Sequence, residues 1–366
     1  MLQSFLFKIK DHRRSQGQRY ELSAILLLSI LAITSGATSY RKICIFIATH
    51  YKRLAPLLEL NWKRMPAHTT IRAIIQNTDS SSLESSFRGY SAELASGQAE
   101  QEAIAFDGKV LRKSFDHFQD EKAKQLLSSF LSESQLILAH AEIARKSNEI
   151  PSARQLIEEL GIQDELLTFD ALHCQEETLK VAEETNNAVI VQVKGNQKTL
   201  LHDCQTIAAT QTPVEVYQEP FTKAHGRIES RTVSLFPLPS LTNLLKWDTV
   251  QAVIKVQRFR SSFDTKSKTW KDSHETAFYI STTLLSAQTF CQVIRNHWGI
   301  ENRNHYVRDV TLGEDSSRIR INPAIFARLR SFALNILRFN HVSNISQALY
   351  QNALNLDNLL NYKGIF

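Results

Sequence analysis

The succession of apolar runs between residues 101 and 210 constrains the fold of this chain more than any other feature. Three strand-like runs come first, over 103–106, 110–115 and 134–144. Two further strands then alternate with amphipathic helices, one of which has Pro151 in its first turn and Gly161 just past its end. Alternating strands and helices predict a sheet covered by helices, and the three leading strands make that sheet a mixed one. We therefore expect an α/β fold.

Two of these predicted strands end on an aspartate. The run Ala103–Phe106 is followed by Asp107, and the run Leu166–Phe169 is followed by Asp170. Asp107-Gly108 is also a common hairpin-turn dipeptide, and an aspartate after a strand can cap the next helix. Alternatively, the two carboxylates are ligands of one site. The residues alone leave both interpretations open.

A third carboxylate lies on a long helix expected over 287–310. The positions that recur there at steps of three and four residues are Ile294, His297, Trp298, Glu301, His305 and Arg308. They share one face of an α-helix. Because apolar Ile294 and Trp298 lie on this face, we expect Glu301 to face inward, where a carboxylate needs a partner or a metal ion. The alternative is a Glu301 exposed on a solvated face.

Three carboxylates that converge on one point would form a site of hard oxygen ligands. Such ligands favour magnesium or manganese over zinc. Two ions about 4 Å apart can activate water on one side and hold the leaving oxygen on the other, which is the chemistry of phosphodiester cleavage.

Composition agrees with a nucleic-acid partner without proving one. The chain has 366 residues and a formal net charge of +6, which favours a polyanion such as DNA. Its four cysteines have no zinc-like spacing, and the start of the chain lacks the pattern of a secretory signal, so we expect a cytoplasmic protein. The apolar run Leu22–Ile33 is shorter than a membrane span of about 20 residues, so we expect a buried helix and no membrane partner.

The pattern of predicted helices and strands divides the chain into five segments. Residues 1–100 are expected to be a helical N-terminal domain whose short helices permit a DNA-binding helix-turn-helix, although helical bundles that bind nothing are also common. The others are a first part of the α/β core over 101–210, a β-rich insertion over 211–283, a second core part with the Glu301 helix over 284–345, and a C-terminal tail over 346–366.

Several stretches resemble one family in its order along nearly the whole chain. They are "RYELSAILLLSILAITSGA", "MPAHTTIRAII", "IAFDGKVLRKS", "KSNEIPSARQLIEEL", "LLTFDALHCQEET", "VIVQVKGNQKTL", "HGRIESRTV", "IRNHWGIENRNHYVRDVTLGEDSSRIR" and "LRSFALNILR". The sequence closely resembles the bacterial insertion-sequence transposases of the ISAs type, also called H-repeat-associated proteins. These belong to the DDE transposases, whose catalytic core is RNase H-like. The resemblance therefore implies an RNase H-like mixed sheet flanked by helices.

The resemblance also implies roles. Asp107, Asp170 and Glu301 match the catalytic acid triad, which binds two divalent ions, Mg²⁺ or Mn²⁺. The enzyme would cut DNA at the ends of its element and join the released 3′-hydroxyl to target DNA, as a homodimer on paired ends. Competing interpretations are an RNase H-like nuclease without strand transfer, a decayed copy that only binds DNA, and a DNA-binding regulator.

Further residues are candidates for contacts with DNA. Along the last catalytic helix the wider superfamily places Tyr, Arg, Glu and Lys at positions that here hold Ile294, His297, Glu301 and Arg308. The acid and one cation therefore match, whereas the Tyr and Arg positions do not. The candidate DNA-binding residues are Lys194, Gln197, Lys198, His225, Arg227, Arg231, His297 and Arg308. For the first three the alternative is a solvated strand-to-helix turn, and for the next three a surface hairpin.

Overall fold

The computed structural model describes residues 1–96, 102–111, 114, 123–143, 149–224, 226–238, 247–264 and 266–366. The chain forms two compact units. The first unit contains Met1–Glu100, Gly108–Glu149 and Ile300–Phe366, and the second contains Gln101–Asp107 and Ile150–Gly299. This division cuts across the five predicted segments, since the N-terminal helices share a unit with part of the predicted core.

The first unit begins with the expected helices. They are α1 (Leu2–Phe7), α2 (Leu22–Thr34), α3 (Tyr40–Leu57), α4 (His68–Gln76) and α5 (Ser80–Ala95). Every residue of α2 is buried, as its uninterrupted apolar sequence predicts. The Ser29 and Thr34 hydroxyls donate to the carbonyl oxygens of Ile25 and Ile30, at 2.6 and 2.8 Å, so these buried polar groups are satisfied. Across the described parts, no helix is both long and apolar enough to cross a membrane.

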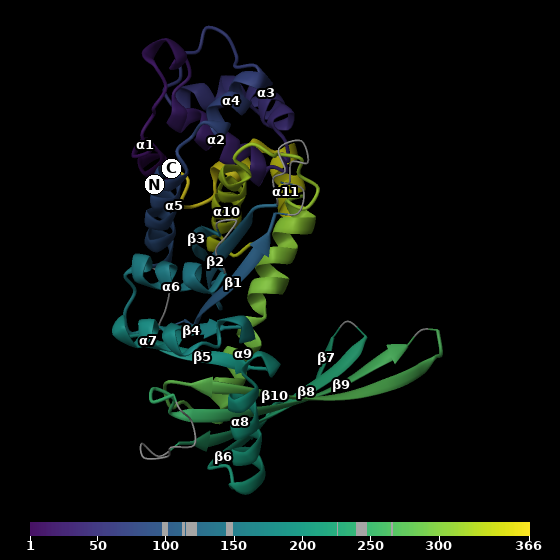
Figure 1. Ribbon diagram of the computed structural model, residues 1–366. Coiled ribbons are helices and arrows are strands. Elements are labelled where there is room, and N and C mark those ends of the chain that lie inside the picture. Colours follow the sequence, from purple (N-terminus) through teal and green to yellow (C-terminus); the bar gives the residue numbers. More distant parts are fainter. Residues whose placement is uncertain are drawn as a thin grey trace. The chain divides into compact units, whose positions relative to one another are not determined.

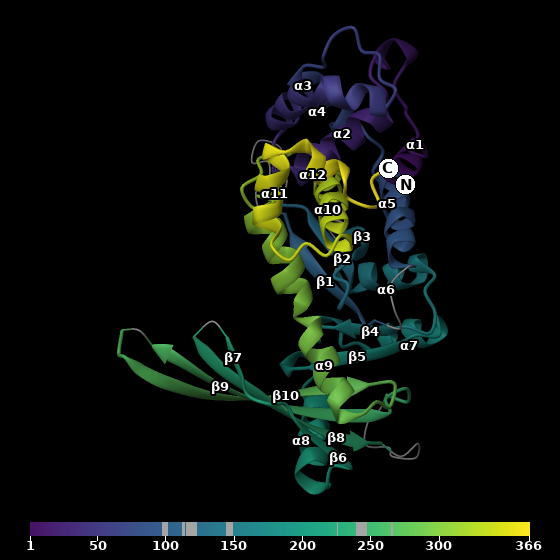
Figure 2. The same cartoon turned by 180° about the vertical axis from the view of Figure 1, so that it is seen from behind.

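Helix α10 (Pro323–Phe339) packs against α2 and completes the core of this unit (Figure 1). The predicted C-terminal tail folds onto the same core as α11 (Ile345–Leu354) and α12 (Leu356–Leu360) (Figure 2). Leu359 is fully buried, and the Asn352 amide donates to the carbonyl oxygen of Thr34 at 2.9 Å. These residues are therefore part of the folded unit, and the expectation of a tail was wrong.

The strands of the first unit differ from those expected. Strand β1 (Ile104–Val110) runs without a break through Asp107-Gly108. The next strand is β2 (Gln125–Leu131), which pairs in antiparallel fashion with β3 (Ile137–Ile143). A strand was expected over 110–115, but Leu111 and Ser114 are not in a strand. Residues 112, 113 and 115 lie outside the described residues. The strand order here is β3-β2-β1.

The second unit holds the larger part of the sheet. The first residues of β1 pair in parallel with β4 (Leu166–Phe169), and β4 pairs in parallel with β5 (Ala188–Val193). Beyond β5 the order continues β10-β9-β8-β6 through antiparallel pairs. These strands are β6 (Glu215–Gln218), β8 (Arg227–Pro237), β9 (Ala252–Asp264) and β10 (Thr269–Ser281), with the short β7 (Thr222–Ala224) beside β8. The β-rich insertion thus continues the sheet, because β10 pairs directly with β5 (Figure 1).

Helices flank this sheet as the sequence predicts. They are α6 (Glu149–Leu160), whose first residue belongs to the first unit, and α7 (Glu176–Glu184), α8 (Lys198–Thr210) and α9 (Ala287–His297). Apolar residues of α9, such as Phe290 and Ile294, pack on the inward side chains of β8 and β9, such as Val233 and Ile254. The expected mixed α/β sheet flanked by helices is confirmed.

Candidate active site

The two strand-associated aspartates lie side by side in the second unit. In the parallel pairing of β1 with β4, Phe106 is opposite Phe169, so Asp107 and Asp170 follow at equivalent positions. The two phenyl rings stack, with centroids 4.9 Å apart, on one face of the sheet, and the next residues point to the other face. Both aspartates are half-buried. Because β1 continues past Asp107, the hairpin-turn interpretation of Asp107-Gly108 is wrong.

Asp170 also caps the turn that follows it. Its Oδ1 accepts a hydrogen bond from the backbone N–H of Leu172 at 3.0 Å, at the start of the 3₁₀ turn Ala171–His173. This bond fixes the orientation of the carboxylate. One carboxylate oxygen can serve as a cap while the other serves as a ligand, since an ionised carboxylate offers about four acceptor positions. The two interpretations of Asp170 from the sequence are therefore compatible.

The turn between β5 and α8 braces the Asp170 loop. The Asn196 amide donates to the carbonyl oxygen of Ala171 at 2.6 Å, and the Gln197 amide donates to that of Cys174 at 2.8 Å. Gln197 is therefore engaged in holding the loop, whereas Lys194 and Lys198 are exposed. Asn196 is not among the site residues predicted from the sequence. The available signal was an amide side chain directly after a strand that neighbours the Asp170 strand.

His297 supports the same strand from α9. Its Nδ1 lies 2.8 Å from the hydroxyl of Thr168, two residues before Asp170. Burial, together with the nearby His173, lowers the pKa of His297 to about 4. The imidazole is therefore neutral at pH 7, so the expected contact with DNA phosphate cannot rest on a positive charge at this position.

Glu301 belongs to the first unit and does not lie where a regular α-helix would put it. Helix α9 ends at His297, and the chain continues in two π-helical segments, Ile300–His305 and Val307–Thr311. The wider π-helical turn shifts the stripe of inward-facing residues, so Asn304 and Arg308 are buried and Glu301 is exposed. The expectation that Glu301 faces inward was wrong. Single π-helical turns inside helices occur frequently at functional sites.

A buried ion-pair network in the first unit joins β1 to this π-helical region. The Nζ of Lys109 lies 2.8 Å from Oε2 of Glu314, contacts the carboxylate of Asp309, and donates to the carbonyl oxygen of His305 at 3.4 Å. Arg308 lies 3.0 Å from Oε1 of the same glutamate. We call Lys109, Arg308, Asp309, Glu314 and Arg330 the Glu314 network.

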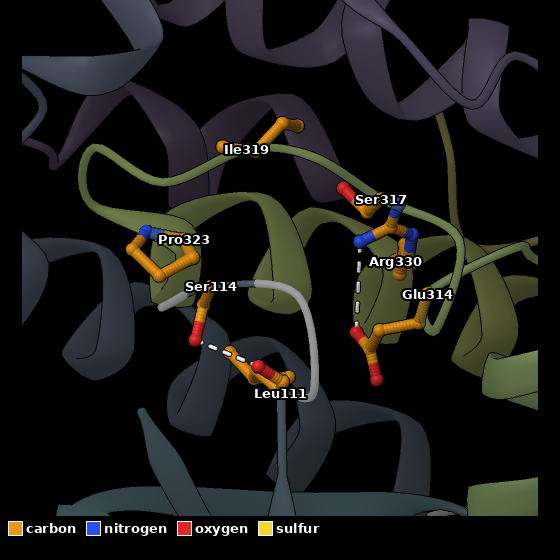
Figure 3. Close-up of a pocket in the computed structure, with 7 residues that line it drawn as sticks. All are labelled: Leu111, Ser114, Glu314, Ser317, Ile319, Pro323 and Arg330. Carbon is orange, nitrogen blue, oxygen red and sulfur yellow. Dashed lines mark hydrogen bonds and ion pairs between the residues drawn. The ribbon is translucent and has the colours of Figure 1, made fainter. Parts of the chain in front are cut away.

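Arg330 completes this network from α10. Its Nη1 lies 3.6 Å from Oε1 of Glu314, and Figure 3 shows the two side chains facing each other. Burial alone would raise the pKa of Glu314, but the charges of Arg308, Lys109 and Arg330 outweigh it and hold that pKa well below its usual range. Arg308 has no exposed surface. The structure gives it an internal role in place of the predicted contact with DNA.

The predicted DNA-binding arginines of the insertion are also paired. Arg231 lies 2.9 Å from Glu219 and 3.8 Å from Glu229, and Arg227 lies 3.0 Å from Glu229. Glu229 is also paired with Arg258 and Arg260, and Glu219 with Arg295, so the two carboxylates offset only part of the charge of these five arginines. The contact of Arg227 and Arg231 with DNA stays a prediction. His225, the third residue of this group, lies outside the described residues.

The donor set of the two aspartates suits a divalent cation. Hard carboxylate oxygens are the ligands that Mg²⁺ and Mn²⁺ prefer. Within the described ranges, no three His, Cys, Asp or Glu side chains lie close enough together to hold a metal ion. The structure thus brings together Asp107 and Asp170, and a third ligand has to come from elsewhere.

Comparison with known families identifies the chain. The family described as "Transposase DDE domain" matches residues 99–336, and the family described as "DDE_Tnp_1-associated" matches residues 3–91. The chain belongs to the DDE transposase family. The first match includes Asp107, Asp170 and Glu301, and the second covers α2 to α4 and most of α1 and α5. The family in general uses divalent metal ions.

Curated relatives agree with this assignment. Two from Escherichia coli strain K12 are each 29% identical over 90% of this DDE transposase and 88% of their own length, "Putative protein YbfL" and "H repeat-associated putative transposase YhhI". "Putative transposase YncI" of Escherichia coli O157:H7 is 29% identical over 92% of this chain and 87% of its own length. The family expected from the sequence motifs is confirmed.

Proposed function

We propose that this DDE transposase cuts DNA at the ends of an insertion sequence and joins the 3′-hydroxyl to target DNA. The observation that carries the proposal is that Asp107 and Asp170 each directly follow the last residues paired between two adjacent parallel strands, Phe106 and Phe169. Ligands of open α/β sheets commonly bind beyond the carboxyl ends of such strands. Glu301 is the proposed third acid, supplied by the π-helical segment.

Asp107 and Asp170 are the residues that would hold Mg²⁺ or Mn²⁺, with two ions proposed. Such ions lower the pKa of water and stabilise the leaving oxygen of an in-line displacement. The protein's part is to fix the Asp170 carboxylate, through the Leu172 cap and the Asn196 and Gln197 hydrogen bonds to the loop that follows it. Lys194 and Lys198, exposed at the end of the neighbouring strand, are proposed to contact phosphates of the bound DNA.

The test is a cleavage and strand-transfer assay on duplexes that carry the ends of the element. We expect Mg²⁺-dependent nicking and joined products with the unmodified protein, and background levels with Asp107→Asn, Asp170→Asn and Glu301→Gln. Glu184→Gln removes an exposed carboxylate of α7 and serves as the control that retains activity.

The assay also separates the competing functions. Nicks without joined products would indicate an RNase H-like nuclease, and DNA binding without nicks would indicate a decayed copy. We propose a homodimer on paired ends by resemblance to the family. The mass of the complex with two element-end duplexes tests this, and a single protomer on two duplexes would overturn it.

A further inference from the structure

A basic cavity lies within the first unit, apart from the carboxylates. Its volume is about 510 Å³, and it is bounded by the start of α3, by α4 and by the segment 316–321. Its polar lining residues include Thr38, Ser39, Arg72, Gln76, Arg318 and Arg320. No described aspartate or glutamate lines it. A cavity of this size is large enough for a ligand but unusually basic, because small-molecule sites are mostly apolar.

The charges of this cavity are uncompensated. Arg72, Arg318 and Arg320 are exposed, and none forms an ion pair with any carboxylate among the described residues. A second cavity of the first unit has the same volume, about 510 Å³, and includes Arg13. There Asp11 accepts hydrogen bonds from the Arg13 guanidinium at 2.8 and 2.7 Å. Only the first cavity therefore offers several unpaired guanidinium groups to an anion.

The backbone around the cavity adds to the positive potential and fixes its shape. Ser39 is the N-cap of the 18-residue helix α3, so the positive end of that helix dipole faces this site. The arginine-bearing segment is anchored, since the Asn322 amide donates to the carbonyl oxygen of Gln76 at 3.2 Å. Ser316 donates to the carbonyl oxygen of Gly313 at 2.9 Å, and Gly313 has a φ of +64°, which favours glycine.

We propose that this cavity, which we call the arginine groove, binds the phosphodiester backbone of DNA. Guanidinium groups match phosphate oxygens in a bidentate geometry, and hydroxyl and amide side chains complete such contacts. The groove would increase the affinity for DNA and position the duplex on the protein. It would not recognise bases, since its lining offers charges and short polar groups. The choice of DNA as the polyanion rests on the proposed function of the chain.

The test compares two triple variants in DNA binding without divalent metal, so that cleavage plays no part. The first is Arg72→Gln, Arg318→Gln, Arg320→Gln. The control, Lys52→Gln, Lys63→Gln, Arg64→Gln, removes the same charge from exposed positions of the same unit. Fluorescence anisotropy with a random-sequence duplex gives the affinity between about 50 and 200 mM salt.

We expect the groove variant to lose roughly three phosphate contacts. The negative slope of log K against log salt then becomes less steep by about 2.7. The affinity of the unmodified protein then drops about 40-fold more than that of the groove variant over this fourfold salt range. A duplex with element ends should show the same loss, because phosphate contacts weaken binding uniformly across sequences. The control variant should change the slope by clearly less, and thermal melting should show that both variants are folded.

Equal slopes for the two triple variants would overturn the proposal, as would a loss seen only with the element-end duplex. Binding of inorganic phosphate that needs the arginines, without any effect on duplex affinity, would make the groove a site for a small anion and also overturn it. If duplex binding depends on the groove but Mg²⁺ gives no cleavage, the catalytic proposal fails while the groove stands.

Discussion

Replacing Glu314 with glutamine should destabilise the protein more than any exposed acidic substitution. Glu314 is buried, and Lys109, Arg308 and Arg330 lie 2.8, 3.0 and 3.6 Å from its carboxylate. Glu314→Gln keeps the shape but removes the carboxylate that Arg308 and Arg330 share, and it leaves Lys109 with Asp309 alone. Removal of one partner from a buried ion pair costs about 3–5 kcal/mol. This corresponds to a roughly 150- to 5,000-fold change in the unfolding equilibrium.

The assay is urea or thermal denaturation of the variant beside the unmodified protein. For a domain of about 150–250 residues, each kcal/mol shifts Tm by about 2–4 °C, so we expect a decrease of about 6–20 °C. Glu93→Gln, at an exposed position of α5, is the control and should stay within about 0.5 kcal/mol. A loss below about 1 kcal/mol for Glu314→Gln would refute the reasoning.

The same residue makes stability depend on pH. The folded-state pKa of Glu314 is held below the ordinary 4.5 by the three cations, although burial opposes them. A depressed carboxyl pKa stabilises the fold fully above the unfolded pKa, and this contribution is lost as the pH falls below about 4.5. The slope of unfolding free energy against pH in this acid range should therefore be smaller in Glu314→Gln.

Two further predictions concern the surroundings of Asp170. NMR titration of His297 should give a pKa of about 4, and the stability it confers should be lost as pH falls from 6.5 towards 4, because the unfolded imidazole binds the proton more readily. A pKa above 6 would contradict its burial. Asn196→Ala removes the bond to Ala171, so we expect it to cost about 0.5–1.5 kcal/mol and to weaken Mn²⁺ binding about 10- to 100-fold. Asn361→Ala, exposed in the first unit, is the control, and equal Mn²⁺ affinity of both variants would exclude a positioning role for Asn196.

Much of the fold can be predicted from local patterns in the sequence. The strand Leu166–Phe169 was predicted with the bounds observed, because it is a short apolar run that ends at a polar residue. The apolar run from Leu22 was correctly predicted to form a buried helix, since only a fully buried helix accommodates so continuous an apolar surface.

The misjudged features depend on tertiary structure. The Asp107-Gly108 dipeptide has the composition of a hairpin turn, but β1 pairs with β4 up to Phe106 and neighbours β2 in the same sheet, so the chain continues through the dipeptide as one strand. The orientation of Glu301 was derived from a constant α-helical period, which the π-helical segments break. The Glu314 network could not be predicted from the sequence either, because Lys109 and Glu314 are 205 residues apart (314 − 109 = 205) and meet only in the folded unit. Glu314 lies only six residues after Arg308 (314 − 308 = 6), but the burial of this ion pair depends on tertiary packing.

Manganese binding by titration calorimetry tests the central claim, that Asp107 and Asp170 form a metal site. The unmodified protein, Asp170→Asn and the control Glu184→Gln are titrated alone and with an element-end duplex. Asparagine retains an oxygen that can accept the Leu172 hydrogen bond, so Asp170→Asn removes the charge and keeps the cap. We predict binding by the unmodified protein and the control, and loss of most binding in Asp170→Asn. Equal binding by all three proteins, or none by any of them even with DNA, would contradict the claim and leave Asp170 as a cap alone.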